Sequence, residues 1–177
     1  MKDNFIEVEI SKEMYENAKK IADAQGALKG SIRFGKGNLT GYLGEEIFYK
    51  LFPKAERIND YESDFALNGY KIEVKSKQCS SKPLEHYEGS VTYSKKPQDC
   101  DIYFFTRIHK DTRTGWYCGW RTHDSFLRDA LVLRKGDTDP KNNYVCKRDC
   151  WNMKYNDMND IDSLKLYVED NKEGERL

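Results

Sequence analysis

The sequence predicts an α/β fold in which a central β-sheet is flanked by α-helices. Two strand-like runs of alternating apolar residues lie on either side of Asn68-Gly69. Asn-Gly is the preferred dipeptide of a two-residue hairpin, because both turn positions need a positive φ. An apolar pattern with helical spacing precedes this hairpin at residues 41–52, and an aromatic, strand-like run follows it at 101–108. Helices and strands therefore alternate along one chain.

Length and composition predict a single domain over residues 1–177. With 177 residues and 38% hydrophobic content, the chain can bury one core, and aromatic side chains must supply much of it. We place the core of the domain at about residues 40–131 and expect residues 168–177 to form a mobile tail. No run approaches the ~18–20 apolar residues that cross a bilayer. Residues 1–5 lack an apolar signal region, so a cytoplasmic location is expected.

Two helices are predicted before the hairpin. Residues 11–25 space Met14 and Ala18 along one face, which is typical of an amphipathic helix. The second helix, at 41–52, carries a broad apolar face. On a helical wheel Glu45 lies nearer the edge of that face than Glu46 does. We therefore expect Glu45 to look inward and Glu46 to be solvated.

The hairpin brings two carboxylates and one ammonium together. Successive side chains of a strand point to opposite faces, so Glu73 and Lys75 must project from the same face. Pairing back across the turn can bring Asp64 towards them. The sequence therefore predicts a polar cluster on the returning strand.

Such a cluster suits a hard divalent cation and phosphate chemistry. Mg²⁺ takes one or two carboxylates and leaves its other positions to water and substrate phosphate, and Mn²⁺ is the alternative cation. Asp64 and Glu73 are the candidate ligands, the Val74 backbone carbonyl is a third, and Glu45 is a fourth, either directly or through water. The compact charge of Lys75 could orient an attacking water and offset charge on the phosphate. The competing interpretation is an ordinary solvated hairpin, since 34% of the chain is charged.

Residues 40–77 resemble the PD-(D/E)XK nuclease superfamily, which has the restriction-endonuclease-like fold. The resemblance rests on the helix with Glu45, on Asp64, and on Glu73-Val74-Lys75 after eight intervening residues. Ser63 stands where the name of the family has a proline. The resemblance implies a mixed central sheet and a Mg²⁺-dependent endonuclease of phage or mobile-element type that acts on DNA. Glu45, Asp64, Glu73 and Lys75 would be its catalytic residues.

Further elements are predicted after this core. Residues 101–108 and 116–120 indicate two aromatic strands joined by a polar turn, and Thr122 or Asp124 can cap a helix that runs to about Leu131. The strand, strand, helix order extends the resemblance to about residue 131. A short strand around residues 144–146 and a closing helix at about 159–167 complete the predicted elements.

Charge patterning identifies candidate contacts to nucleic acid. The formal net charge is zero, with 30 basic and 30 acidic residues, which disfavours tight nonspecific DNA binding. Local basic clusters can still line a groove. The candidate phosphate contacts are Lys29, Arg33, Lys36, Lys77, Lys82, Lys95 and Lys96. DNA is the expected partner, RNA stays open, and a homodimer could cut both strands.

Three other motifs carry weaker predictions. Gly30 to Lys36 fits the start of a phosphate-binding loop, but Gly37 replaces the Ser or Thr that would reach Mg²⁺. Five cysteines in a chain without an export signal are expected to be reduced thiols. His123-Asp124-Ser125 cannot easily form a hydrolase relay from consecutive positions, so helix capping explains it better.

Two other functions stay open beside the nuclease. One is a noncatalytic nucleic-acid-binding module that kept the fold. The other is a structural or protein-interaction domain, which the neutral charge favours. A ribonuclease is a variant of the nuclease hypothesis, since the resemblance also covers enzymes that act on RNA.

Overall fold

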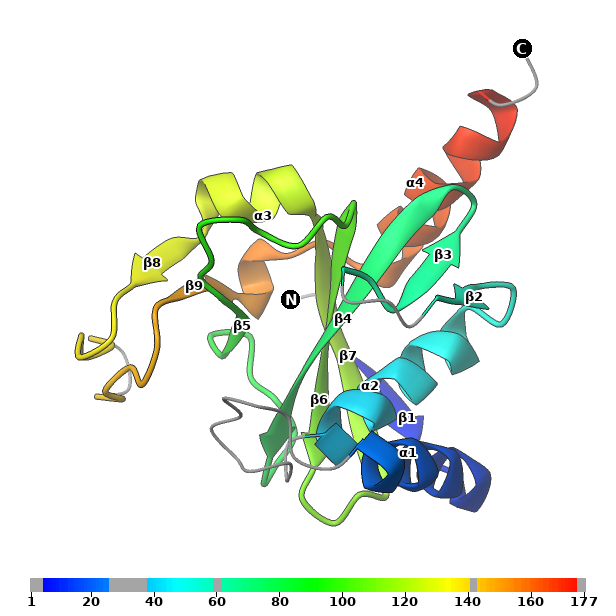
Figure 1. The fold of residues 1–177 in the computed structure, drawn as a ribbon, viewed down its shortest axis with the longest axis horizontal. Coiled ribbons are helices and arrows are strands. Elements are labelled where there is room, and N and C mark those ends of the chain that lie inside the picture. The colour runs from blue at the N-terminus through cyan, green and yellow to red at the C-terminus, as the bar shows by residue number, and fades with distance from the viewer. Residues whose placement is uncertain (1–4, 26–37, 59–61, 141–142, 175–177) are drawn as a thin grey trace.

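In a computed structural model of the chain, residues 5–25, 38–58, 62–140 and 143–174 are described. These residues form a mixed α/β structure with a six-stranded sheet, a smaller three-stranded sheet and α-helices on both sides of the larger sheet (Figure 1). The predicted α/β class is confirmed. Lys29, Arg33, Lys36 and the glycine-rich stretch around them lie outside the described residues.

The six-stranded sheet has the order β1-β7-β6-β4-β3-β2. Among the described strands, only β4 and β6 pair in parallel, with Glu73 opposite Tyr103 and Lys75 opposite Phe105. All other pairs are antiparallel, so the sheet is mixed. The strands are β1 (Ile6–Glu9), β2 (Glu56–Arg57), β3 (Phe65–Leu67), β4 (Tyr70–Cys79), β6 (Ile102–His109) and β7 (Thr114–Thr122).

The predicted hairpin is confirmed in its turn and register. Asn68 and Gly69 both have positive φ, 51° and 86°, and Leu67 pairs with Tyr70 on either side of them. The pairing of β3 with β4 covers only Tyr70–Ile72. Within the described residues, no strand pairs with that edge of β4 from Glu73 to Cys79. The polar residues of the motif therefore line an open edge of a strand in the middle of the sheet.

The two faces of the sheet have separate cores. Ile72, Val74 and Phe104 pack against helices α2 (Asn38–Leu51) and α4 (Ile161–Gly174). Phe48 of α2 lies at this centre, with its ring 4.9 Å from that of Phe104. Helix α1 (Lys12–Gln25) packs against α2 in a third cluster. Aromatic residues supply much of both cores, as the composition predicted.

The opposite face of the sheet carries Tyr103 and Phe105, which pack against helix α3 (His123–Asp129) and the small sheet. Because side chains alternate, Glu73 and Lys75 share this second face with Tyr103 and Phe105. Helix α2 lies on the first face. The candidate site thus lies at the open edge of β4, where side chains from both faces of the sheet can approach one another.

Helix α2 approaches the sheet closely at Gly44. A Cβ added there would lie 1.8 Å from the Ser76 hydroxyl and 2.6 Å from that of Thr106. These two hydroxyls are hydrogen-bonded to each other at 2.8 Å. Glycine therefore lets the helix backbone lie directly on β4 and β6, and the next residue, Glu45, is placed beside the open edge.

The small sheet was not predicted from the sequence. Its order is β5-β9-β8, from β5 (Glu88–Thr92), β9 (Cys150–Lys154) and β8 (Leu131–Leu133). The predicted strand around 144–146 is wrong, because Val145 makes only an isolated bridge to Thr138. The predicted helix end at Leu131 is also wrong: α3 ends at Asp129, and Leu131 begins β8. Thr122 is confirmed as the helix cap, since its hydroxyl accepts from Ser125 N.

The closing helix extends beyond its prediction. α4 runs to Gly174, and Val168, where the mobile tail was predicted to begin, is 2% exposed in the main core. A tail starting at residue 168 is therefore a wrong prediction. Among the described helices, none combines the length and the apolar character needed to cross a bilayer.

Candidate active site

Asp64 lies directly before β3, at the open edge of β4. Its backbone N–H donates to the Ile72 carbonyl at 2.9 Å, which continues the hairpin ladder by one residue. Its side-chain Oδ2 accepts from the Val74 N–H at 2.8 Å. The carboxylate therefore takes the place that a longer β3 would occupy. This confirms that the hairpin turns Asp64 back towards Glu73-Val74-Lys75.

Glu73 and Lys75 project together, as the period of two predicted. Lys75 Nζ lies 2.6 Å from Glu73 Oε1, and the two side chains are 25% and 10% exposed. A third residue joins them: the Gln98 amide donates to Glu73 Oε1 at 3.0 Å and its carbonyl accepts from Lys75 Nζ at 2.8 Å. Gln98 was missed because it lies in a polar loop whose sequence shows no motif.

Hydrogen bonds from neighbouring residues hold the loop that carries Gln98. The Asp99 N–H donates to Glu62 Oε2 at 2.6 Å, and the Lys71 N–H donates to Asp101 Oδ2 at 2.7 Å. The Asp101 N–H returns a bond to the Lys71 carbonyl at 2.9 Å. Glu62 and the start of β4 therefore hold the residues that directly follow Gln98.

Glu45 reaches the site from α2, and Arg57 of β2 links it to Glu46. Arg57 lies 3.4 Å from Glu45 Oε2 and 2.5 Å from Glu46 Oε1. Its guanidinium also lies over the rings of Tyr49 and Phe65, 5.1 Å from each centroid. Glu46 is 6% exposed, so the prediction of a solvated Glu46 is wrong. The half-buried Arg57 compensates its charge, and α2 therefore presents two acidic side chains inward.

The carboxylates of Glu45, Asp64 and Glu73 are largely buried and repel one another. Burial raises the pKa of Glu45 from 4.5 to about 8, with the negative charge of Asp64 as the next cause. Burial likewise raises the pKa of Asp64 from 3.8 to about 7, with Glu73 as the next cause. Arg57 and Lys75 oppose these shifts only in part. When all these carboxylates are ionised they carry more negative charge than Arg57 and Lys75 neutralise, so the site takes up protons and favours a cation in their place.

The donor set fits a hard divalent cation. Carboxylate oxygens of Asp64 and Glu73, with Glu45 nearby, match the oxygen ligands that Mg²⁺ and Mn²⁺ prefer. The C=O of Val74 points to the same edge as its N–H, since both groups of one strand residue face the same neighbour. Within the described residues, no group of three or more His, Cys, Asp or Glu side chains is gathered closely enough to form a metal cage. The residues therefore fit a cation that keeps several waters, with two carboxylates as ligands.

The predicted lysines lie in different settings. Lys77 follows Lys75 on the same face of β4 and is half-buried, where it donates to Ser90 Oγ at 2.5 Å. Lys82, Lys95 and Lys96 are exposed, and the last two belong to the loop that also carries Gln98. Lys77 is thus the predicted lysine that the structure places beside the carboxylate site.

The other candidate motifs, His123-Asp124-Ser125 and the five cysteines, make contacts of other kinds. His123 and Asp124 form an exposed contact of 3.0 Å at the start of α3, and Ser125 is occupied by the cap with Thr122. All five cysteines are free thiols, and burial, followed by the neighbouring Cys146, raises the pKa of the Cys150 thiol. Among them, Cys100 is near the carboxylate cluster, since burial and then the charge of Glu73 raise the pKa of its thiol.

A scan of the chain against protein-family models finds no match, and a search of curated proteins finds no relative. The function must therefore be argued from the geometry of the site.

Proposed function

We propose that this chain is a metal-dependent nuclease that hydrolyses DNA phosphodiester bonds, with Mg²⁺ or Mn²⁺ as its cofactor. One observation carries the proposal. Asp64, Glu73 and Glu45 gather with Lys75 at the open edge of β4, and burial together with mutual repulsion raises the pKa values of Asp64 and Glu45. Functional sites are where such uncompensated charge is commonly retained.

The topology supports the restriction-endonuclease-like assignment. A β-hairpin bearing Asp64 and Glu73 leads into a parallel pair, β4 with β6, and β7 then returns antiparallel. Helix α2, with Glu45, covers the face of this sheet that carries Val74. The order of these elements and residues is that of the PD-(D/E)XK pattern noted in the sequence.

The residues take distinct roles in this proposal. Asp64 and Glu73 would hold the cation, with the Val74 carbonyl and Glu45 as further ligands. When bound, the cation supplies Lewis acidity and a more nucleophilic water. Lys75 orients that water and offsets charge on the phosphate. The water oxygen forms a bond to phosphorus, the P–O bond on the opposite side breaks, and the leaving oxygen takes up a proton.

Gln98 acts as a positioning residue. It contacts Glu73 through its amide and Lys75 through its carbonyl, so it holds both side chains at the same edge. The bond from Lys75 to the Gln98 carbonyl does not involve Glu73, so it would anchor Lys75 also with Glu73 as a cation ligand. The exposed lysines of the same loop, Lys95 and Lys96, extend positive charge from this point.

The purified chain is expected to cut DNA only when Mg²⁺ or Mn²⁺ is present. The assay compares linear, supercoiled, branched and single-stranded DNA with RNA, each with cation and with excess chelator. Asp64→Asn is expected to lower the rate by at least ~100-fold, since electrostatic groups at reaction centres contribute about that much. Asp23→Asn, on an exposed position of α1, is the matched control and should retain the rate.

Each outcome of this assay separates the hypotheses. Cleavage of RNA alone makes the chain a ribonuclease. DNA binding without cleavage supports a noncatalytic nucleic-acid module instead. Absence of both binding and cleavage favours a protein-interaction domain and rejects the nuclease.

A further inference from the structure

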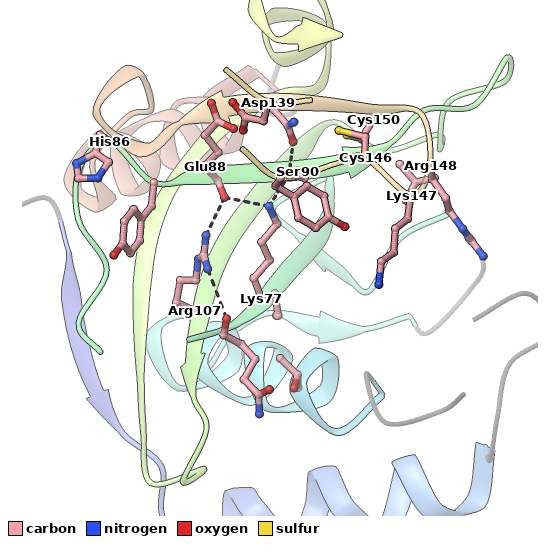
Figure 2. Close-up of a pocket in the computed structure, with 17 residues that line it drawn as sticks. Lys77, His86, Glu88, Ser90, Arg107, Asp139, Cys146, Lys147, Arg148 and Cys150 are labelled. Carbon is pink, nitrogen blue, oxygen red and sulfur yellow. Dashed lines mark hydrogen bonds between the residues drawn. The ribbon is translucent and has the colours of Figure 1, made fainter. Parts of the chain in front are cut away.

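A pocket of about 690 Å³ opens beside the candidate active site. Ser76, Lys77 and Gln78 line it, so it continues along the open edge of β4 directly after Lys75. Figure 2 shows Lys77 and Arg107 rising into this pocket from the large sheet. Lys147 and Arg148 extend in the opposite direction from the segment before β9. The pocket is therefore bounded by both sheets.

Cationic side chains outnumber carboxylates around this pocket. Lys77, Arg107, Lys147 and Arg148 line it, against the carboxylates of Glu88 and Asp139. The chain as a whole has a net charge of zero. Thr40, in the first turn of α2, also lines the pocket, and the positive end of that helix dipole adds to the local potential. The lining of the pocket therefore favours an anion.

Two of the cations are fixed in place. Lys77 donates to the Glu88 carbonyl at 3.2 Å, and Arg107 donates to the same carbonyl at 3.0 Å. Arg107 also donates to the Tyr155 hydroxyl at 2.7 Å. Burial lowers the pKa of Lys77 to about 8, and the neighbouring charge of Arg107 is the next cause. A bound anion would offset the repulsion between these two side chains.

The remaining lining suits a base and a sugar. Tyr144 lines the pocket and is 52% exposed, and His86 adds a second aromatic ring. Asn152 supplies a side-chain amide that is 7% exposed. The volume lies within the range of about 300–1,000 Å³ that small-ligand pockets occupy. One nucleotide combines an anion, a flat ring and polar edges, as this lining requires.

The pocket and the carboxylate site follow one another along β4. Lys77 shares a face of β4 with Glu73 and Lys75, and two residues of a strand span about 7 Å. That distance is of the order of the spacing between successive phosphates of an extended strand. A strand held with one phosphate at Lys75 would place the next at Lys77.

We propose that the pocket between β4, β5 and the 143–150 segment binds one unpaired nucleotide of a DNA strand, adjacent to the phosphodiester at the carboxylate site. This inference rests on the proposed nuclease function for its orientation of the strand. It makes single-stranded DNA, or a single-stranded end or branch, the substrate class. A nucleotide within a duplex keeps its base paired and cannot enter a pocket of this kind without unpairing.

The test is equilibrium binding of a fluorescein-labelled oligothymidylate of about ten nucleotides, a length typical of single-strand sites. The full chain is used, with chelator to prevent cleavage and a thiol reductant. The double variant Lys147→Glu with Arg148→Glu should bind at least tenfold more weakly. Its slope of log affinity against log salt should fall by about 1.4, because two phosphate contacts are lost at about 0.7 each.

A second pair of variants tests the base. Tyr144→Ala should bind about tenfold more weakly, whereas Tyr144→Phe keeps the ring and should bind like the wild type, because base stacking needs only the ring face. The charge-matched control reverses Lys12 and Lys165 to Glu, two exposed cations on α1 and α4, and should leave affinity unchanged. All substituted side chains are exposed, so the fold is expected to be retained.

Wild-type affinity in both the Lys147/Arg148 variant and Tyr144→Ala overturns the pocket assignment. So does equal loss in the Lys12/Lys165 control, or duplex binding as tight as that of the single strand. Failure of the nuclease proposal has a different signature: oligonucleotide binding depends on the pocket residues, yet no cleavage occurs with Mg²⁺ or Mn²⁺.

Discussion

Lys75→Met lowers the rate of DNA cleavage by about 10²–10⁴-fold, the contribution of a well-placed side chain at a reaction centre. The physical reason is the position of its Nζ, 2.6 Å from Glu73 and 2.8 Å from Gln98 at the open edge of β4. Affinity for Mn²⁺ stays equal or rises, because Glu73 loses the ammonium that competes with the cation. The measurement is the cleavage rate under saturating cation.

Lys110→Met is the matched control for this substitution. Lys110 follows β6, the parallel partner of β4, and it is exposed at the turn before β7. Its removal should leave the cleavage rate unchanged. Undiminished cleavage by Lys75→Met, or an equal loss with Lys110→Met, would show that the ammonium has no special part in the reaction.

Glu45→Gln stabilises the cation-free protein at about pH 8, by on the order of 2 kcal/mol. The pKa of Glu45 is raised from 4.5 to about 8, chiefly by burial and then by Asp64. Between these two values the folded protein holds a proton that the unfolded chain has released. The free energy of unfolding of the wild type therefore falls as pH rises through this window. Glutamine removes that penalty and also relieves Asp64.

The pH dependence of the free energy of unfolding measures this effect. Urea denaturation in chelator should show a flatter profile for Glu45→Gln than for the wild type between about pH 5 and pH 8. Glu16→Gln, an exposed carboxylate on α1, should follow the wild type. A wild-type profile that rises with pH across this range, or a variant less stable at every pH, would contradict the raised pKa of Glu45.

In the proposed metal site, the same carboxylates would make cation binding and the stability of the cation-free protein oppose each other. A cation that binds the folded protein stabilises it by mass action, and its carboxylate ligands must lose their protons first. Glu45→Gln is thus expected to gain stability without cation and to gain less from added Mn²⁺ than the wild type. Functional sites commonly retain such a cost.

The hairpin and the Glu73 register could be predicted because local chemistry determines them. Asn68-Gly69 specifies the turn, and strand alternation then places Glu73 and Lys75 on one face, with both conditions fulfilled by neighbouring residues. The helix before the hairpin was predicted for the same reason. Its apolar spacing is readable without any distant partner.

The small sheet, Glu46 and Gln98 depend on distant residues. Val91 of β5 pairs with Trp151 of β9, which lies far along the chain, and neither strand shows a clear alternation in isolation. Glu46 is buried beside Arg57 of β2, whose guanidinium lies over the ring of Phe65 in β3, so both partners come from other elements. Gln98 is placed by Glu62 and by the start of β4. The residue pattern within one helix or strand cannot predict partners that come from distant parts of the chain.

Calorimetric titration of Mn²⁺ into the chain is the most direct measurement, with Asp64→Asn and Glu73→Gln titrated beside the wild type. The wild type should bind the cation and release protons near pH 7, since the raised pKa of Asp64, about 7, leaves part of it protonated before binding. Each variant should bind at least ~10-fold more weakly, as one carboxylate ligand is lost. Binding of equal strength in all three proteins, or none in the wild type, would contradict a metal site at the open edge of β4.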